Sequence, residues 1–306
     1  MKHYIAIARP SHWFKNIFII PGFVLGLLVV DHSPENLFLK SIFAIISVCL
    51  VTSANYTINE WLDADFDKFH PLKKNRPSVL GHIKYEFVIL QYVMLSVIGL
   101  FLAYNVSKAY FVTSFVLLFM GFMYNVLPFR TKDRVYLDVL SESVNNPLRL
   151  LLGWFVIIYD FLPPSSLLIA YWVGGAFLMA VKRYSELRLI SDRSNAELYR
   201  KSFKHYSENS LLISIFFYAM VFGFFFGVFM IKYKIEFLLT FPLLAILFSW
   251  YLKIGMKENS VAQRPEKLFK EKLFMFYCIF LVCSLVVLYF VDIPFLHVLL
   301  NPIFPK

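Results

Sequence analysis

Long apolar runs separated by short charged segments dominate the hydrophobic pattern of this chain. A helix needs about 20 mostly apolar residues to cross the hydrocarbon core of a bilayer. Nine segments meet this requirement: 14–31, 37–58, 86–105, 109–127, 136–159, 163–181, 210–231, 235–252 and 273–293. Uninterrupted runs such as 211–231 exclude a transmembrane barrel, whose strands alternate over about ten residues. The pattern predicts an all-α membrane protein with nine transmembrane helices.

Composition and charge support this class and give it an orientation. Apolar residues make up 59% of the 306 positions and charged residues 16%, with no linker-like segment, so we expect one membrane domain over residues 1–306. Of the 30 Lys and Arg residues, 24 fall in segments that share one side if the N-terminus is cytoplasmic. The positive-inside rule therefore predicts a multi-pass protein of the inner (plasma) membrane with its charged loops in the cytoplasm. The net charge of +10 follows from this bias, and we expect the lipid bilayer, not nucleic acid, as partner.

A polar ladder marks the predicted cytoplasmic end of the second span. Asn55, Asn59, Asp63 and Asp67 recur every four residues, so they share one face if the helix continues. Mg²⁺ takes one or two carboxylates and completes its shell with water and phosphate oxygens. The spacing favours a Mg²⁺ site on the two aspartates, and the alternative is a solvated helix end.

A cationic loop follows the ladder directly. His70, Lys73, Lys74 and Arg76 lie within ten residues of Asp67. Lysine holds phosphate oxygens as a point charge and arginine holds them as a fork. Metal-binding carboxylates beside such a cluster are typical of a diphosphate site.

The fifth predicted span carries ionisable residues at membrane depth. Asp138, Glu142, Asn145 and Arg149 fall on one helical face if residues 136–159 form one helix. Such groups are costly inside a bilayer, so they pair with one another or face a wet cavity. Both interpretations stay open: a structural Glu142–Arg149 pair, or the lining of a substrate chamber.

Several sequence motifs resemble those of a known superfamily. The segment NEWLDADFD at 59–67 resembles the first Asp-rich motif, NDxxDxxxD, of the UbiA superfamily of intramembrane prenyltransferases. The segments RPSHWFKN at 9–16, HPLKKNRP at 70–77 and KRYSEL at 182–187 are similar to motifs of its decaprenyl-phosphate phosphoribosyltransferase family. The last three spans carry no such motif. Glu60 replaces an aspartate, either Arg130 or Lys132 takes the role of a lysine that follows Tyr124 in the family, and no second Asp-rich motif follows span six.

The resemblance implies a UbiA-type bundle and a specific reaction. A 5-phosphoribosyl group would move from phosphoribosyl diphosphate to a polyprenyl phosphate such as decaprenyl phosphate, with Mg²⁺ as cofactor, for synthesis of a cell-envelope glycan precursor. Asn59, Asp63 and Asp67 would be the catalytic, metal-binding residues. The expected substrate-binding residues are Lys15, His70, Lys73, Arg76, Tyr124, Arg130, Lys132, Asp138, Lys182, Arg183 and Glu186.

Two other functions compete with this one. An aromatic prenyltransferase would use the same ladder on a polyprenyl diphosphate and prenylate 4-hydroxybenzoate or another quinone precursor. A transporter or channel would use the buried polar residues as an ion path. Lys182 and Arg183 stand where prenyl-diphosphate enzymes carry their second acidic motif, which favours a donor with an additional phosphate. The sequence leaves open whether the chain forms a homo-oligomer.

Overall fold

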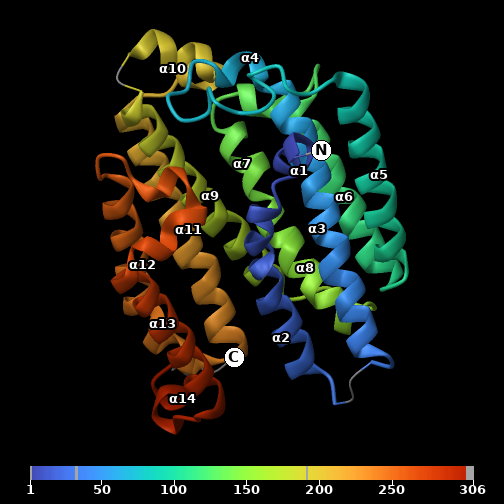
Figure 1. Ribbon diagram of the computed structural model, residues 1–306. Coiled ribbons are helices and arrows are strands. Elements are labelled where there is room, and N and C mark those ends of the chain that lie inside the picture. Colours follow the sequence, from blue (N-terminus) through green and yellow to red (C-terminus); the bar gives the residue numbers. More distant parts are fainter. Residues whose placement is uncertain (1, 32–33, 191, 301–306) are drawn as a thin grey trace.

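The computed structural model describes residues 2–31, 34–190 and 192–300, and its elements in these ranges are helices (Figure 1). The first part of the chain forms α1 (Lys2–Ala8), η1 (Pro10–Ile19), α2 (Ile20–Val29), α3 (Leu37–Leu62), α4 (Ala64–Asp67), α5 (Tyr85–Tyr104), α6 (Lys108–Asn125), η2 (Thr131–Asp133), α7 (Leu137–Ser143) and α8 (Asn145–Ile157). The second part forms α9 (Ser165–Leu189), α10 (Arg193–Tyr199), η3 (Lys201–Lys204), α11 (Glu208–Tyr233), η4 (Ile235–Thr240), α12 (Phe241–Gly255), η5 (Val261–Gln263), η6 (Pro265–Lys270), α13 (Lys272–Phe290) and α14 (Pro294–Leu300).

The chain is a multi-pass integral membrane protein. Seven helical segments among the described residues are long and apolar enough to cross a bilayer: Lys2–Val29, Leu37–Leu62, Tyr85–Tyr104, Ser165–Leu189, Glu208–Tyr233, Ile235–Gly255 and Lys272–Phe290. The fourth and fifth expected spans coincide with α6 and with the pair α7–α8, which do not meet the same measure. The all-helical membrane class is thus confirmed, whereas the number of nine spans stays a prediction.

The fifth expected span is not one helix, which corrects the sequence-based expectation. The helix stops at Ser143, and α8 begins at Asn145. Pro147 lies in the first turn of α8, where its missing N–H cannot donate to the carbonyl of Ser143. Val144 itself keeps right-handed helical angles (φ −54°, ψ −27°), so α8 follows α7 after an interruption of one residue.

The predicted cytoplasmic loops gather at one end of the bundle. α4 and α10 lie there together, and α14 lies at the opposite end (Figure 1). Two apolar cores fill the bundle, one around α3, α6 and α8 and one around α9, α11 and α12. Helices α8 and α9 pack against each other and join the two halves.

Close helix packing holds the first half together. A Cβ atom on Gly22 would lie 1.9 Å from the carbonyl oxygen of Leu150, and one on Gly153 would lie 2.0 Å from that of Ile19. Both positions therefore need glycine, because the backbones of α2 and α8 are nearly in contact there. This contact fixes the segment before α2, which carries Arg9 to Asn16, against α8.

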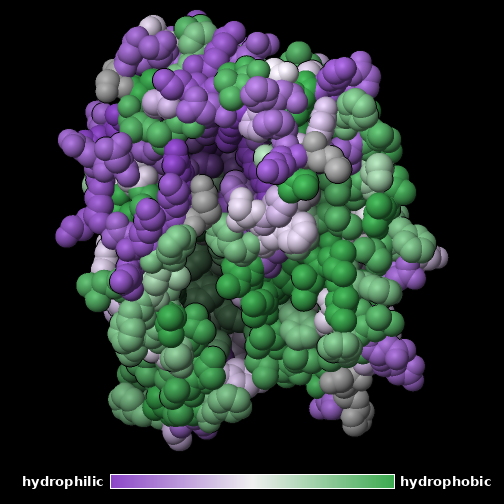
Figure 2. Space-filling view, viewed as in Figure 1, coloured by the Kyte–Doolittle hydropathy of each residue, from purple (hydrophilic) through white to green (hydrophobic). Residues whose placement is uncertain are grey.

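The outer surface has two chemically distinct zones. Hydrophilic residues crowd the end that holds α4 and α10, and hydrophobic residues cover most of the remainder (Figure 2). Large apolar side chains such as Phe38, Phe216 and Phe276 are at least two thirds exposed, as expected for groups that face lipid. Figure 2 also shows that the molecule is hollowed along the middle of this face, with hydrophilic residues above and hydrophobic residues below.

Candidate functional site

Asn59, Asp63 and Asp67 keep their common face although α3 ends between them. α3 ends at Leu62, and Asp63 has near-helical angles (φ −96°, ψ −3°) before the single turn of α4. The Asp63 N–H donates to the Asn59 carbonyl at 3.0 Å, and the Asp67 N–H donates to the Asp63 carbonyl at 2.8 Å. The Asn59 side-chain amide donates to Asp63 Oδ2 at 3.1 Å. The i, i+4 spacing thus places Asn59, Asp63 and Asp67 on one face, as the sequence predicted.

Asn55 does not belong to the site. Its amide donates to the Leu117 carbonyl on α6 at 3.0 Å, and a Cβ on Gly121 would overlap it. This side chain therefore joins α3 to α6, so the expected four-residue stripe is shortened to three.

Two cations from the segment after α6 converge on the first ladder carboxylate. Arg130 Nη2 donates to Asp63 Oδ1 at 3.0 Å, and Lys132 Nζ donates to the same oxygen. Lys132 also donates to Asn125 Oδ1 at 2.7 Å, which in turn accepts from the Asn59 amide at 2.6 Å. Both Arg130 and Lys132 thus contact Asp63, and which of them takes the role of the family's lysine stays open.

The loop after α4 supplies the partners of the second ladder carboxylate. Arg76 Nη1 donates to Asp67 Oδ2, and Lys73 Nζ contacts the hydroxyl of Tyr199 and lies 3.5 Å from Glu186 Oε1. His70 is 2% exposed and packs edge-on against the Tyr199 ring, with 4.6 Å between ring centroids. The exposed Lys74 forms no ion pair within the described part of the chain.

Burial and charge shift the pKa values of this loop in opposite directions. Burial raises the pKa of Asp67 despite the nearby charge of Arg76. For Asp63, burial is outweighed by the charge of Lys132, which holds its pKa below the usual range. Burial lowers the pKa of Lys132 to about 8, and burial together with the charge of Lys73 lowers that of His70 to about 3. The site therefore holds a neutral His70 near the charged Asp63 at neutral pH.

Arg183 forms the centre of a largely buried ion cluster. Its guanidinium donates to Asp138 Oδ2 at 3.0 Å, to Glu186 Oε2 at 3.0 Å and to Glu142 Oε2 at 2.6 Å. Asp138 and Glu186 are 0% and 1% exposed. Arg183 was expected to bind a substrate phosphate, which stays a prediction; in this structure its guanidinium contacts three carboxylates.

Tyrosine and arginine side chains complete this cluster. Tyr124 donates its hydroxyl to Glu142 Oε2 at 2.8 Å and accepts from Arg183 at 3.1 Å. Tyr206 donates to Asp138 Oδ1 at 2.8 Å, and Arg200 Nη1 lies 3.8 Å from Asp138 Oδ2. The cluster thus connects α7, α9 and the α10–η3 segment beneath the polar ladder.

Of the two interpretations of the fifth span, the described contacts do not include the structural ion pair, and the lining of a substrate chamber stays a prediction. Glu142 binds Arg183, whereas Arg149 Nε donates to Asn16 Oδ1 at 3.1 Å and Arg149 Nη1 to the Asn145 carbonyl at 3.3 Å. A Glu142–Arg149 pair is therefore absent from the described contacts. Glu142 and Arg149 lie on different sides of Val144 and contact different neighbours, Arg183 and Asn16.

The segment before α2 lies against α3 below the ladder. Arg9 forms an ion pair with Glu60 at 2.8 Å, and Trp13 Nε1 donates to the Ser53 hydroxyl at 2.9 Å. Lys15 Nζ lies 3.3 Å from His12 Nδ1 and 5.8 Å from the centre of the Tyr56 ring. The RPSHWFKN segment thus forms one wall of the site.

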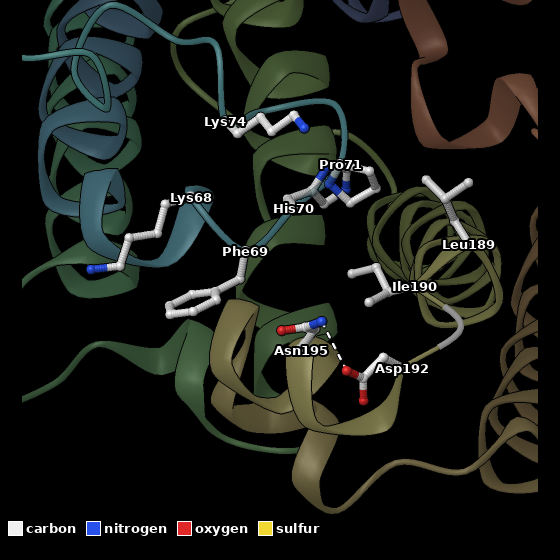
Figure 3. Close-up of a pocket in the computed structure, with 9 residues that line it drawn as sticks. All are labelled: Lys68, Phe69, His70, Pro71, Lys74, Leu189, Ile190, Asp192 and Asn195. Atoms are coloured by element: carbon white, nitrogen blue, oxygen red, sulfur yellow. Dashed lines mark hydrogen bonds between the residues drawn. The ribbon is translucent and has the colours of Figure 1, made fainter.

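Two cavities border the ladder and its loop. One of about 10 Å³ is lined by Asp63, Phe66, Asp67, Arg130, Lys132, Asp133, Tyr199 and Arg200. The other, of about 370 Å³, lies between the loop after α4 and the end of α9, with His70 and Pro71 facing Leu189 and Ile190 (Figure 3). His70, which lines the larger cavity, packs against Tyr199, which lines the smaller one.

The ladder fits a hard divalent cation by its donor chemistry. Asp63 and Asp67 line the same cavity, and the charge of Asp63 acts on Asp67. Two neighbouring carboxylates in a buried place stay charged only next to positive charge. Arg76, Arg130 and Lys132 supply that charge in this structure, and a divalent cation would supply it in the same way. Oxygen donors of this kind suit Mg²⁺ better than zinc.

The structure adds site residues that the sequence did not single out. Asn125 receives hydrogen bonds from both Asn59 and Lys132, and Tyr199 and Arg200 line the ladder cavity. These residues are recognised only in the tertiary structure, where the ends of α6 and α10 lie next to α4. The sequence signal was limited to Asn125 following Tyr124 and to the cationic character of the loop after α9.

Known proteins are similar to this chain over most of its length. Residues 18–280 match the model of the UbiA prenyltransferase family. Decaprenyl-phosphate phosphoribosyltransferases of Mycolicibacterium smegmatis and Mycobacterium tuberculosis are 25% and 26% identical over 68% and 66% of this chain. The matched part spans less than two thirds of their own length, 63% and 65%.

A solved structure shares the fold. A UbiA homolog from Archaeoglobus fulgidus, bound to DMAPP and Mg²⁺, is similar with a TM-score of 0.69 and 18% identity. The similarity covers 94% of this chain and 100% of that one. A second structure of that homolog, bound to GPP and Mg²⁺, gives a TM-score of 0.70 over 92% and 99% of the two chains.

Proposed function

Because this chain belongs to the UbiA prenyltransferase family, a family of membrane transferases, we propose that it transfers a 5-phosphoribosyl group from phosphoribosyl diphosphate to a polyprenyl phosphate. The relatives named decaprenyl-phosphate phosphoribosyltransferase support this choice of substrates, although only about a quarter of aligned residues are identical. The product would be a lipid-linked phosphoribosyl precursor of a cell-envelope glycan.

The charge balance around the ladder is the observation that carries the proposal. Five cations surround the two ladder carboxylates: Lys73, Arg76, Arg130, Lys132 and Arg200. A prenyl diphosphate brings one anionic group, whereas phosphoribosyl diphosphate also brings a 5-phosphate. Lys73, Arg130 and Arg200 also lie near Glu186, Asp133 and Asp138, so the charges balance without a ligand. Five cations that can each exchange a carboxylate for a phosphate oxygen nevertheless favour the donor with more phosphates.

Each ladder residue has a defined task in this proposal. Asp63 and Asp67 would hold Mg²⁺, oriented by Asn59, and the ion would neutralise the departing diphosphate. Arg76, Arg130 and Lys132 would then exchange their carboxylate partners for diphosphate oxygens. Arg183 would act as a positioning residue, since its donors are already used by three carboxylates.

The reaction needs no strong general base. An anionic oxygen of the lipid phosphate attacks C1 of the ribose, and the bond from C1 to the diphosphate oxygen breaks. The diphosphate leaves with that electron pair, and charge is conserved without a proton transfer. Positioning and electrostatic stabilisation would supply most of the acceleration.

Charge distribution supports the proposed orientation. We propose that α6 and the pair α7–α8 complete nine crossings, with the N-terminus and the site at the cytoplasmic face. The loops that contribute site residues, 59–85, 128–135 and 182–209, together carry 15 of the 30 Lys and Arg residues.

A direct transfer assay tests the function. Purified protein with Mg²⁺, polyprenyl phosphate and phosphoribosyl diphosphate labelled in the ribose is expected to move label into the organic phase. Omitting Mg²⁺ or the lipid should abolish the signal. Absence of lipid-linked label, together with prenylation of 4-hydroxybenzoate from a polyprenyl diphosphate, would instead identify an aromatic prenyltransferase.

A further inference from the structure

Three side chains with metal-binding chemistry meet at the end of the bundle opposite the ladder. Glu236 lies in η4, between α11 and α12, while Asp292 and His297 belong to the segment that follows α13. One ligand atom from each side chain, two carboxylate oxygens and one imidazole nitrogen, lies within 4.8 Å of the others. Figure 1 shows α14, which carries His297, far from α4 and α10. The cluster is therefore separate from the candidate site described above.

Glu236 is fully buried although it lies at the start of an apolar segment. The residue is 0% exposed and belongs to the candidate span Ile235–Gly255. Its Oε1 accepts a hydrogen bond from the Ile293 N–H at 3.1 Å, whereas its Oε2 receives no hydrogen bond. A carboxylate that is removed from water is costly unless donors and cations satisfy both of its oxygens. Glu236 thus keeps an acceptor position that the described hydrogen bonds do not fill.

Lys234 balances only one of the two carboxylates. Its Nζ lies 3.1 Å from Glu236 Oε2, and it donates a hydrogen bond to the Val291 carbonyl at 2.8 Å. Among the described residues, the one basic group within 4.0 Å of an Asp292 carboxylate oxygen is the imidazole of His297. When this imidazole is neutral, one negative charge of the cluster remains, and a bound cation would neutralise it.

The position of the His297 imidazole matches metal ligation. Its Nε2 lies 3.2 Å from Glu236 Oε1 and 3.2 Å from Asp292 Oδ1. A single ring N–H points along one direction, so it cannot make two linear hydrogen bonds at once. Bonds of about 2.0–2.1 Å from Zn²⁺ place tetrahedral ligand atoms about 3.3 Å apart, which is close to both N–O distances.

We propose that Glu236, Asp292 and His297 bind a divalent transition-metal ion of the Zn²⁺ type at the end of the bundle opposite the ladder. One imidazole and two carboxylates suit Zn²⁺, whereas Mg²⁺ prefers oxygen ligands. Three protein ligands leave the fourth tetrahedral position to water. Because the ligands come from η4 and from the segment after α13, the ion would act as a clip that holds this segment on the bundle.

Zinc binding to the purified full chain tests the site. The chain in detergent is treated with a chelator, which is then removed, and radiolabelled Zn²⁺ is titrated by equilibrium dialysis with Mg²⁺ in excess for the ladder. We expect one Zn²⁺ per chain at this site. His297→Gln and Asp292→Asn should each weaken its binding by at least about 10–100-fold, because loss of even an outer partner of a ligand costs that much. Both side chains are more than half exposed, so these variants should fold.

Two other substitutions of His297 distinguish a metal ligand from a cation. His297→Cys supplies a thiolate, which ligates Zn²⁺ without positive charge, so zinc binding should be retained. His297→Lys supplies a permanent cation for the two carboxylates but a poor ligand near neutral pH, so zinc binding should be lost. As controls, His205→Gln and Asp160→Asn remove exposed side chains outside the cluster and should leave zinc binding unchanged.

Two results would overturn the proposal. The first is a wild-type chain that binds no Zn²⁺ in excess Mg²⁺, or that binds it no better than folded His297→Gln and Asp292→Asn proteins do. The second is loss of zinc binding in folded His297→Cys protein together with a wild-type unfolding midpoint in His297→Lys protein, which would identify His297 as a charged bridge between the carboxylates. None of these measurements involves a transferred group, so failure of the proposed function would leave this site intact.

Discussion

The role of Arg183 can be tested most sharply, because the sequence and the structure assign it different tasks. Arg183→Met removes a guanidinium that contacts three carboxylates, two of them fully buried. Breaking one buried ion pair typically costs about 3–5 kcal/mol, because a charge is left without compensation. Lys73, 3.5 Å from Glu186, and Arg200, 3.8 Å from Asp138, offset part of this loss. We therefore expect Arg183→Met to lower the free energy of unfolding by about 3–5 kcal/mol, the cost of one buried ion pair and not of three.

Thermal unfolding in detergent measures this effect. A loss of that size lowers the midpoint by about 10 °C in a chain of more than 150 residues. The control is Arg188→Met on the same helix, whose pair with Glu208 spans 3.7 Å between exposed side chains. Exposed pairs are worth about 1 kcal/mol or less, so the control midpoint should move by no more than about 3 °C.

A second substitution distinguishes a buried charge from simple loss of packing. Adding Glu186→Gln to Arg183→Met removes one of the uncompensated carboxylates and should recover part of the lost stability. If Arg183→Met keeps the wild-type midpoint but weakens donor binding, the buried-cluster reasoning is refuted. Arg183 would then be a direct phosphate ligand, as its sequence motif first suggested.

Three further predictions concern the ladder, the helix packing and pH. Asp63→Asn and Asp67→Asn should each reduce transfer at least about a hundredfold without loss of folded protein, and full activity in both would contradict the metal assignment. Gly153→Ala should destabilise by about 1–3 kcal/mol in thermal unfolding, because its Cβ would lie 2.0 Å from the Ile19 carbonyl oxygen; an unchanged midpoint would mean that α2 and α8 are further apart. Burial and Lys73 lower the pKa of His70 to about 3, whereas an unfolded histidine binds its proton near 6.5, so His70 contributes stability that is lost as pH falls from 6.5 to 3. The midpoint of His70→Gln should therefore depend less on pH across that window than the wild-type midpoint, and parallel profiles would exclude His70 as a source.

Local spacing in the sequence predicted the ladder correctly. The backbone hydrogen bonds from Asp63 to Asn59 and from Asp67 to Asp63 keep the i, i+4 geometry through the helix break. Apolar run length likewise predicted the all-helical membrane class, because the bilayer imposes it on any chain of this composition. These features depend on residues close in sequence, so the sequence alone determines them.

Ion pairing was decided by the tertiary structure. Arg183 lies three residues from Glu186 but 45 from Asp138, and nothing in the local pattern distinguishes it from its neighbour Lys182. Glu142 binds Arg183 on α9, whereas Arg149 lies near Asn16 on η1, so residues of the expected stripe contact different segments. Which charges are neutralised and which remain for a ligand depends on helices that meet across the bundle. The sequence therefore determined where the ionisable residues lie along the chain, whereas packing decided which of them remain available to bind a substrate.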